Sequence, residues 1–300
     1  MNVVVIGGTG LMGPYLLDLL CDAGHDVTCI NRRGRAHRGN PISCDRRDPA
    51  RLNQIFASLN PDVVIDMIPF IRADAEGVVE ALGEGGEVKL VAVSSIDVYQ
   101  AYGRLHRTEP GPYQECPIRE EDALRALPSI RQETYDKIGV ERCYLDAFEN
   151  VSILRMPAIY GWPDTSRVSD YLKVSDSPEK RLRIHPDFAK WGFTRASSRD
   201  CARAIAMTIS LTGHSIYNVG EEDLLSEEAW CREIWNAAGD SGEIVYDENV
   251  PIPYNIDTQQ SWHVSSEKIR RELCYSEEYS RAEVLRNTIH RIREAGNVGE

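Results

Sequence analysis

Four glycines near the start of the chain have the spacing of a turn that binds a diphosphate. Residues 3–6 are apolar and β-branched, which predicts a buried strand, and they lead directly into Gly7, Gly8, Gly10 and Gly13. Gly7 and Gly8 permit a tight turn, and Gly10 lets the backbone approach phosphate. Gly13 allows a following helix to pack closely on the sheet, with its amino end facing an anion. The pattern predicts a site for NAD or NADP.

The residues after these glycines supply the helix that such a site needs. Apolar residues fall on one helical stripe, and Gly24 ends it; the stripe comprises Leu11, Met12, Tyr15, Leu16, Leu19 and Leu20. Gly7, Gly10, Leu11, Met12 and Gly13 are the residues of this turn expected to contact the cofactor. The alternative is an ordinary turn from a strand to a helix.

Arginines follow the second expected strand, residues 26–30. NAD sites usually have Asp or Glu about 20 residues beyond the glycines, where the carboxylate accepts from the ribose 2′-hydroxyl, whereas NADP needs cations for its 2′-phosphate. This chain has Asn31, Arg32 and Arg33 at that place, with Arg35 and Arg38 close behind. A carboxylate would repel the phosphate and two guanidinium groups would bind it, so NADP is favoured over NAD. The alternative is a solvated arginine loop.

The composition excludes several classes of protein. The formal charge of −13 disfavours binding to nucleic acid or to anionic lipid, which would repel the chain. No run approaches about 18 consecutive apolar residues, and the chain enters its first strand without a targeting segment. Eight scattered cysteines, with no Cys-x-x-Cys pair, suit a reducing compartment. We expect a cytoplasmic protein with a small-molecule substrate and no membrane or nucleic-acid partner.

Apolar strand-like runs alternate with helical stretches in the first half of the chain. The runs are residues 3–6, 27–30, 63–68, 90–93 and 151–154, and the helical stretches lie near 11–23, 49–58, 73–83 and 134–148. This alternation predicts an α/β fold, a doubly wound parallel (Rossmann) sheet covered by helices on both faces. Ligands bind beyond the carboxyl ends of such strands, which here are Gly7, Asn31, Ile68, Ser94 and Met156. We include Ile68 among the expected cofactor contacts.

The second half predicts a smaller lobe that binds substrate. Residues 1–160 form the expected nucleotide-binding domain, and residues 161–300 are mainly the substrate lobe, with 196–222 returning to the first domain. Residues 162–195 are expected to be irregular, followed by a helix at 199–211, a strand at 215–219, and helices at 226–238 and 281–294. The long connection at 96–129 is expected to border the site.

Five segments, in order along the chain, resemble motifs of the extended and atypical short-chain dehydrogenase/reductases, in particular the nucleotide-sugar epimerase and dehydratase group. The segments are residues 9–13, 45–48, 94–99, 154–161 and 217–220. The resemblance implies that Asp45 contacts adenine and that Pro157 lies beside the nicotinamide. It also implies a homodimer through helices packed beside the active site.

The catalytic pair of this family is not preserved. In the family, a tyrosine and a lysine four residues later share one helix face, where the cation and the ribose lower the pKa of the phenol. Here Tyr135 is followed at that distance by Gly139, and Lys137 is preceded by Glu133. Either Tyr135 or Glu133 occupies the tyrosine position, and neither alignment keeps the pair.

Tyr135 and Lys137 would point about 200° apart in one continuous helix. Thr134 is expected to cap the helix with Asp136 in its first turn, so that Tyr135 lies at the entrance and the two side chains can converge. The hypothesis is that Lys137 holds the ribose hydroxyls and Tyr135 acts as the acid/base. In the alternative, Tyr135 is a buried aromatic and Lys137 a solvated partner of Glu141.

Ser95 and Asp97 complete the expected catalytic set. Ser95 lies where the resemblance implies the hydroxyl that hydrogen-bonds the reacting oxygen of the substrate, although a serine at a strand end is also a common turn residue. Asp97 falls where the sugar 4,6-dehydratase branch has its catalytic Glu, while Ile96 replaces that branch's Asp. Asp97 is therefore expected as a catalytic acid, with a capping role as the alternative.

The second lobe offers residues for an anionic or sugar-bearing substrate. The candidates are Arg181, Arg183, His185, Trp191 and Arg195, with a solvated face as the alternative for the first two and a loop position for His185. Seven dispersed histidines without metal-ligand spacing predict no metal site. The sequence thus predicts an NAD(P)-dependent epimerase, dehydratase or reductase acting by hydride transfer on a sugar-like or other small metabolite. The alternative is an inactive NAD(P)-binding regulator or scaffold.

Overall fold

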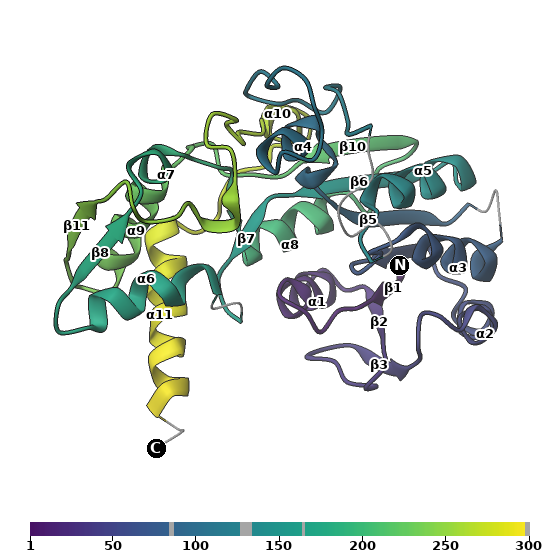
Figure 1. Cartoon of the computed structure of the whole chain (residues 1–300). Helices are drawn as coiled ribbons and strands as arrows, with labels where there is room; N and C mark the ends of the chain where they lie inside the picture. Colours follow the sequence, from purple (N-terminus) through teal and green to yellow (C-terminus); the bar gives the residue numbers. More distant parts are fainter. Residues whose placement is uncertain (84–86, 127–133, 164–165, 298–300) are drawn as a thin grey trace.

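A parallel sheet of seven strands forms the centre of the molecule. The computed structural model describes residues 1–83, 87–126, 134–163 and 166–297. In sheet order the strands are β10 (His214–Asn218), β6 (Val151–Met156), β5 (Lys89–Ser95), β4 (Val63–Asp66), β1 (Asn2–Ile6), β2 (Asp26–Asn31) and β3 (Asn40–Ser43). The order reverses between β1 and β4, which opens a crevice at their carboxyl ends. The predicted α/β class and doubly wound sheet are confirmed (Figure 1).

Helices cover both faces of this sheet. One face carries α1 (Gly13–Asp22) and α8 (Ser198–Met207), and the other carries α2 (Pro49–Leu59), α3 (Arg72–Leu82) and α5 (Lys137–Ala147). Side chains of β1 alternate between the two faces: Val3 and Val5 join the first core cluster, Val4 and Ile6 the second. A strand buried on both faces reads as a continuous apolar run, which is why the sequence identifies it.

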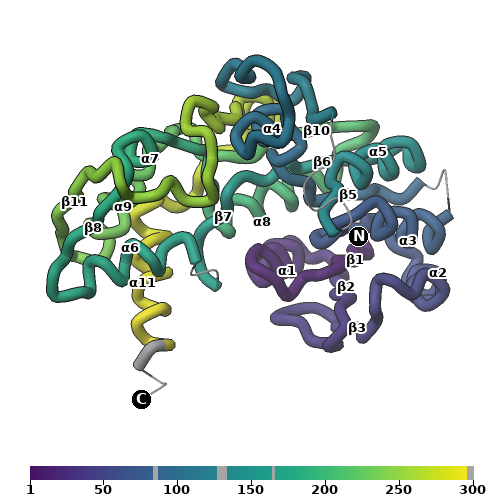
Figure 2. The backbone as a smooth tube through the Cα atoms, in the orientation of Figure 1, coloured from purple at the N-terminus to yellow at the C-terminus, as the bar shows by residue number. Residues whose placement is uncertain are grey.

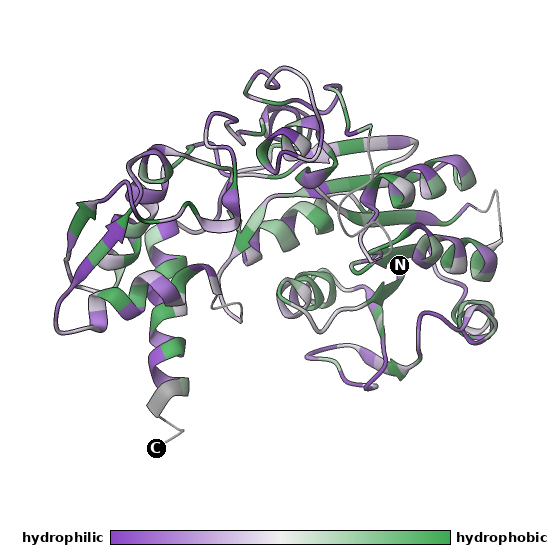
Figure 3. Ribbon diagram, viewed as in Figure 1, coloured by the Kyte–Doolittle hydropathy of each residue, from purple (hydrophilic) through white to green (hydrophobic). Residues whose placement is uncertain are grey.

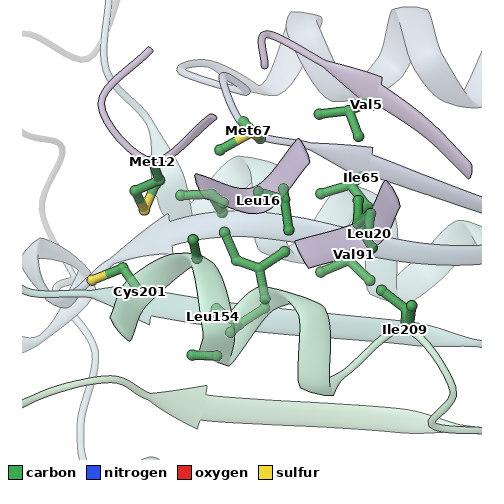
Figure 4. Packing of buried hydrophobic residues seen from close by; sticks show 14 of the residues in the cluster. Val5, Met12, Leu16, Leu20, Ile65, Met67, Val91, Leu154, Cys201 and Ile209 are labelled. Atoms are coloured by element: carbon green, nitrogen blue, oxygen red, sulfur yellow. The ribbon is translucent and has the colours of Figure 1, made fainter. Parts of the chain in front are cut away.

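The packing on the α1 and α8 face is dense and apolar. Leu16 and Leu20 of α1 lie over Val5 and Ile65 of the sheet, and Cys201 of α8 belongs to the same cluster (Figure 4). Hydropathy colouring shows the same division, with hydrophobic residues along the central strands and hydrophilic ones on the outer helix surfaces (Figure 3). Although α8 and β10 follow the first domain in sequence, α8 packs on α1 and β10 pairs with β6.

A smaller lobe lies at one edge of the main domain (Figure 2). It contains α6 (Ser166–Asp176), β8 (Arg181–Ile184), α7 (Pro186–Lys190), α9 (Glu227–Ala237), β11 (Glu243–Tyr246) and α11 (Arg281–Asn297). The expectation of an irregular segment at 162–195 is wrong, because this segment holds α6, β8 and α7. These elements are short and partly exposed, and contacts such as Val168 and Leu172 with Trp230 stabilise them. Such long-range contacts override the weak local pattern.

Further short elements connect the two parts. They are η1 (Ile96–Val98), α4 (Gln100–Leu105), β7 (Ala158–Tyr160), β9 (Arg195–Ser197), η2 (Pro253–Asn255) and α10 (Glu267–Leu273). The connection after β5 is tied back to the core, since Tyr99 bridges to Leu124 and Ile118 bridges to Val264. Within the described ranges, none of the helices has the length and apolar character required to cross a bilayer.

Candidate active site

Two adjoining cavities open at the carboxyl ends of the sheet strands. The glycine cavity, of about 570 Å³, is lined by Gly7, Thr9, Gly10, Asn31, Arg32, Arg33 and Asp45 among others. The main cavity, of about 890 Å³, lies between the end of β5 and the smaller lobe, with Ser95, Asp97 and Tyr135 on its wall. The exposed ring of Phe70 lines both cavities. A ligand long enough to span both would pass this ring.

The glycine turn has the shape that a diphosphate requires. A Cβ at Gly13 would lie 2.2 Å from the Gly8 carbonyl oxygen, so only glycine lets α1 pack this closely. At Gly10 the nearest atom to a built Cβ is 4.0 Å away, which leaves open space beside the backbone. Met12 precedes α1 without a side-chain cap; the Gly13 amide donates to the Gly10 carbonyl at 3.0 Å, which closes the turn, and Pro14 has no amide hydrogen. The residues present therefore fit the diphosphate of a dinucleotide.

The predicted contacts around this turn occupy different places. Leu11 and Pro157 line the main cavity, whereas Met12 is buried in the core and contributes only backbone to the turn. Ile68 covers Gly7: a Cβ on Gly7, whose φ is +87°, would lie 2.7 Å from the Ile68 side chain. Asp45 lines the glycine cavity, and its carboxylate accepts from the Arg47 amide at 3.0 Å.

The arginine loop is organised by Asn31. Its side-chain oxygen accepts from the amides of Arg33 at 3.1 Å and Arg35 at 3.3 Å, and its amide group donates to the Arg35 carbonyl at 2.6 Å. Arg32 and Arg33 are exposed on the wall of the glycine cavity. Arg38 instead forms an ion pair with Asp22 at 2.6 Å. Arg35 is exposed on the same wall, so the loop presents three of its arginines to a ligand.

Tyr135 and Asp97 form a hydrogen-bonded pair on the wall of the main cavity. The Tyr135 hydroxyl donates to Asp97 Oδ2 at 3.0 Å, and the Asp97 amide donates to Ser95 Oγ at 3.2 Å, which starts η1. Burial raises the pKa of the Asp97 carboxyl, against the opposing effect of the Tyr135 hydrogen bond. Burial and the neighbouring Asp97 carboxylate raise the pKa of the Tyr135 phenol. The phenol therefore keeps its proton at neutral pH and is the donor in this hydrogen bond.

Lys137 is buried beside this pair and bonded to the backbone. Its ammonium donates to the carbonyls of Pro69 at 2.8 Å and Val93 at 3.0 Å, and burial lowers its pKa to about 8. Lys137 Nζ lies 5.8 Å from the centre of the Tyr135 ring, so the two side chains do converge. The alternative in which Lys137 is solvated and paired with Glu141 is wrong, because Lys137 is only 4% exposed.

Glu141 has a different partner. Both of its carboxylate oxygens accept from Arg155, at 3.0 and 2.8 Å, and Ser94 donates to the same carboxylate. Arg155 also donates to the Tyr99 hydroxyl at 2.8 Å. This buried network joins Ser94 near the end of β5 to Arg155 near the end of β6. It holds the backbone next to Ser95 in place.

The start of α5 explains why the usual tyrosine and lysine spacing is lost. Asp136, not the expected Thr134, caps the helix: its side chain accepts from the Gly139 amide at 3.0 Å, and the helix begins at Lys137. A Cβ at Gly139 would lie 2.1 Å from the Asp136 carboxylate, so no lysine fits there beside this cap. Tyr135 precedes the helix, as expected. Glu133, the other candidate for the tyrosine position, lies outside the described residues.

His106 is a candidate that the sequence analysis missed. It ends α4, is half-buried, and lines the main cavity with Asp97 and Tyr135. Burial lowers its pKa, while the Asp97 carboxylate acts in the opposite direction. Only its position after the strand-end motif could have suggested it, since a single histidine in a long connection has no distinctive spacing.

The candidates of the smaller lobe separate into two groups. Arg181 is exposed, pairs with Glu243 at 2.8 Å and lies away from the cavity lining. Arg183, His185, Trp191 and Arg195 line the main cavity. Each of these is also held by the protein: Arg183 by Asp247, Arg195 by Glu227, the Trp191 indole by the Gln260 carbonyl at 2.9 Å, and His185 as the cap of α7. Among the described residues, no group of three or more His, Cys, Asp or Glu could hold a metal ion.

Comparisons with known proteins agree with this architecture. A sequence model of the NAD dependent epimerase/dehydratase family matches residues 3–120. This match confirms the resemblance to the epimerase and dehydratase group that the motifs indicate. A search of the curated proteins finds no match to this chain.

Solved structures of epimerases share the fold over the whole chain. UDP-glucose 4-epimerase from Bifidobacterium longum, in complex with NAD+ and UDP, is 16% identical, with 99% of each chain covered and a TM-score of 0.75. The enzyme from Stenotrophomonas maltophila, with bound NAD and formylated UDP-arabinopyranose, is 17% identical, with 99% of each chain covered and a TM-score of 0.75. The Thermotoga maritima enzyme, with UDP-glucose, is 15% identical, covers 98% of this chain and 99% of that one, and has a TM-score of 0.71. These likenesses show the fold.

Proposed function

We propose that the chain is an NAD(P)-dependent enzyme that interconverts a hydroxyl and a carbonyl on a sugar-like or other small molecule, as an epimerase, dehydratase or reductase. The observation that carries the proposal is the hydrogen bond from Tyr135 to Asp97, beside Ser95, in a cavity that adjoins the glycine turn. A proton-transfer pair next to a dinucleotide cradle is what such a reaction needs.

The chain's own residues would manage the reacting oxygen and its proton. A bound nicotinamide would supply the acceptor or donor of hydride for the substrate carbon. Ser95 would hydrogen-bond the substrate oxygen. As the substrate hydroxyl gives its proton to the Tyr135 oxygen, Tyr135 passes its own proton to Asp97 along the 3.0 Å hydrogen bond. In the reductive direction both protons return. Asp97 is then the base, and Tyr135 relays the proton to it.

Lys137 would position the cofactor ribose. An ammonium group has three donors, and the carbonyls of Pro69 and Val93 take two of them. The third is available to a ribose hydroxyl. Because the backbone fixes this ammonium, we assign Lys137 to holding the cofactor and not to lowering the pKa of Tyr135.

NADP is the proposed cofactor. Arg32 and Arg33 lie exposed on the glycine cavity after β2, where a 2′-phosphate would bind, and Asn31 supplies no negative charge there. Two of the similar structures hold NAD, so the preference for NADP rests on these arginines alone.

Calorimetry followed by a turnover assay tests the proposal. Purified protein, stripped of nucleotide, is titrated with NADP+ and with NAD+, and we expect uptake of one equivalent with NADP+ bound more tightly. The protein is then incubated with cofactor and a panel of nucleotide sugars, simple sugars and ketones. Products are followed by absorbance of reduced nicotinamide and by NMR, since an epimerase regenerates its cofactor. Absence of uptake of either nucleotide would defeat the proposal.

One observation favours a second candidate, a nucleotide-binding protein without turnover. The pKa of Tyr135 is raised, whereas the family lowers it, and Gly139 leaves no lysine at the usual place. In this case the protein binds NADP+ but converts no member of the panel. The binding and turnover arms of the experiment separate the two candidates.

A further inference from the structure

Aromatic rings form a continuous wall of the main cavity. This aromatic wall consists of Tyr102, Phe188, Trp191, Phe193 and Trp262. Ring centres of successive members lie 5.9 Å apart for Phe188 and Trp191, 4.9 Å for Trp191 and Phe193, and 6.3 Å for Phe193 and Trp262. All three contacts are stacked, and Tyr102 joins the end of the row at 5.5 Å from Trp262.

The wall is preformed and partly accessible. Phe188 and Trp191 are buried in a core cluster with Ile184 and Ile256, which line the same cavity. Tyr102, Phe193 and Trp262 are half-buried, so part of each side chain remains accessible. A ring that enters this space can stack or pack edge to face without first ordering the wall.

Two arginines of this region are paired with carboxylates, whereas Arg167, exposed on the same lining, has no ion pair among the described residues. Arg195 is buried and bonded to Glu227, and its guanidinium lies 3.9 Å from the centre of the Phe193 ring. Arg183 is bonded to Asp247. The carboxylates of Glu227 and Asp170 line the cavity as well. A diphosphate entering this region would meet these carboxylates, and it would have to break an existing ion pair to gain Arg183 or Arg195.

We propose that this region binds an uncharged ring, so that the substrate is a neutral molecule with a flat or alicyclic ring joined to the reacting hydroxyl or carbonyl. The inference that the substrate carries a reacting hydroxyl or carbonyl rests on the proposed function. The inference that its ring binds here rests on the aromatic wall alone. The cavity volume of about 890 Å³ accommodates such a molecule together with the end of a cofactor.

Isothermal titration of the full chain with two probes tests this. Benzylacetone is a neutral ketone with a phenyl ring, and UDP-glucose carries the diphosphate. We expect benzylacetone to bind and UDP-glucose to give no heat under the same conditions. Tighter binding of UDP-glucose than of benzylacetone, or no binding of benzylacetone, would overturn the inference.

Substitution of Trp262 tests whether benzylacetone binds at the aromatic wall. Trp262→Leu removes a ring whose indole N–H has no partner among the described residues, so the change breaks no described hydrogen bond. We expect it to weaken benzylacetone binding about tenfold and Trp262→Phe to restore most of the affinity. The matched control is Trp162→Leu, a half-buried tryptophan outside the cavity lining, which should leave the affinity unchanged. Equal affinities of wild type and Trp262→Leu would contradict the inference.

A third titration, with NADP+, separates this inference from the proposed function. If NADP+ fails to bind while benzylacetone binds and depends on Trp262, the proposed function fails and the aromatic site stands. If NADP+ binds and a nucleotide sugar is converted while benzylacetone does not bind, the aromatic site is wrong and the proposed function stands.

Discussion

Arg32 and Arg33 on the glycine cavity differ from Arg195 on the main cavity in whether their charge is available to a ligand. Arg32 and Arg33 are exposed on the glycine cavity, so their charge is available to an anion. Arg195, on the main cavity, is buried and forms an ion pair with Glu227, so its charge is not available to a ligand. The partner of Arg195 is 32 residues away in sequence, so no local sequence pattern indicates that the two residues form a pair. An arginine beside a cavity therefore indicates an anionic ligand only when its own carboxylate partners are known.

The Tyr135 and Asp97 pair on the main cavity, which we propose transfers the proton, gives the largest expected effect. Tyr135→Phe removes the proton carrier, and Asp97→Asn removes the base, so we expect either change to lower turnover by about 10²- to 10⁴-fold. Neither should alter NADP+ affinity by more than about twofold, since neither residue lines the glycine cavity. Turnover is measured on the best substrate of the panel, and affinity by calorimetry.

A second tyrosine and aspartate pair supplies the control for this prediction. Tyr113 donates to Asp257 at 3.1 Å, nearly the geometry of Tyr135 and Asp97, but on an exposed surface outside the main cavity. Tyr113→Phe should leave turnover unchanged. Normal turnover by Tyr135→Phe would remove that residue from the reaction.

Buried ion pairs beside the two cavities should both be essential for stability. Arg46 makes two 2.7 Å hydrogen bonds to the fully buried Asp66 carboxylate next to the glycine cavity, as Glu227 holds Arg195 next to the main one. Asp66→Ala leaves the Arg46 guanidinium without this partner in a buried place, so we expect the free energy of unfolding to fall by about 3–5 kcal/mol. Urea denaturation measures the change.

Glu227→Ala should cost a similar amount, because Arg195 is equally buried. The exposed pair of Arg38 and Asp22 is the control, and Asp22→Ala should change stability by less than about 1 kcal/mol. If Asp66→Ala behaves like this control, the Arg46 pair has no structural importance.

The same contrast explains how far the sequence could predict the molecule. The glycine cavity is made of consecutive residues at strand ends, so the run from β1 through Gly13 identifies both the fold and the turn. β3 was missed because it is a four-residue edge strand with little burial and a proline. The resemblance implies a role for Asp45, but no local pattern shows that its neighbour Arg46 is paired with Asp66.

The main cavity could be predicted only in part. Ser95, Asp97, Tyr135 and Lys137 were found because they follow strand-end and helix-start motifs, although the cap at Asp136 was assigned to Thr134. The aromatic wall was missed apart from Trp191. Its members come from α4, α7 and two loops, and no local period connects residues that only the folded chain brings together.

The arginines of the glycine cavity should decide between the two nucleotides. Replacing Arg32 and Arg33 together by alanine removes two of the three exposed loop charges offered to a 2′-phosphate, so we expect NADP+ affinity to fall about 10- to 100-fold. NAD+ affinity should change by less than about threefold. Arg38→Ala, in which the lost arginine already serves Asp22, should affect neither. An equal fall for both nucleotides would mean that the loop binds something other than the 2′-phosphate.

The smallest effect concerns Lys137, which lines the main cavity. Its pKa is lowered to about 8 by burial, from the 10.5 of an exposed lysine. Between these values the unfolded chain binds more protons at this residue than the folded one, so its contribution makes the protein more stable as pH rises from about 8 to 10.5. Below pH 8 the charged, buried ammonium costs stability in full.

The difference in unfolding free energy between wild type and Lys137→Met isolates this contribution, because other titrating groups cancel. As the pH rises from 8 to 10, the free energy of unfolding of the wild type should increase relative to that of the variant. Urea denaturation at each pH measures both values. Lys89, at the start of β5, has its pKa lowered to about 8 by burial as well. Lys89→Met should therefore give a difference of the same sign, and a double variant should show both. A pH-independent difference for Lys137→Met would mean that the ammonium is solvated in the folded protein, and its assignment to the cofactor ribose would lose its basis.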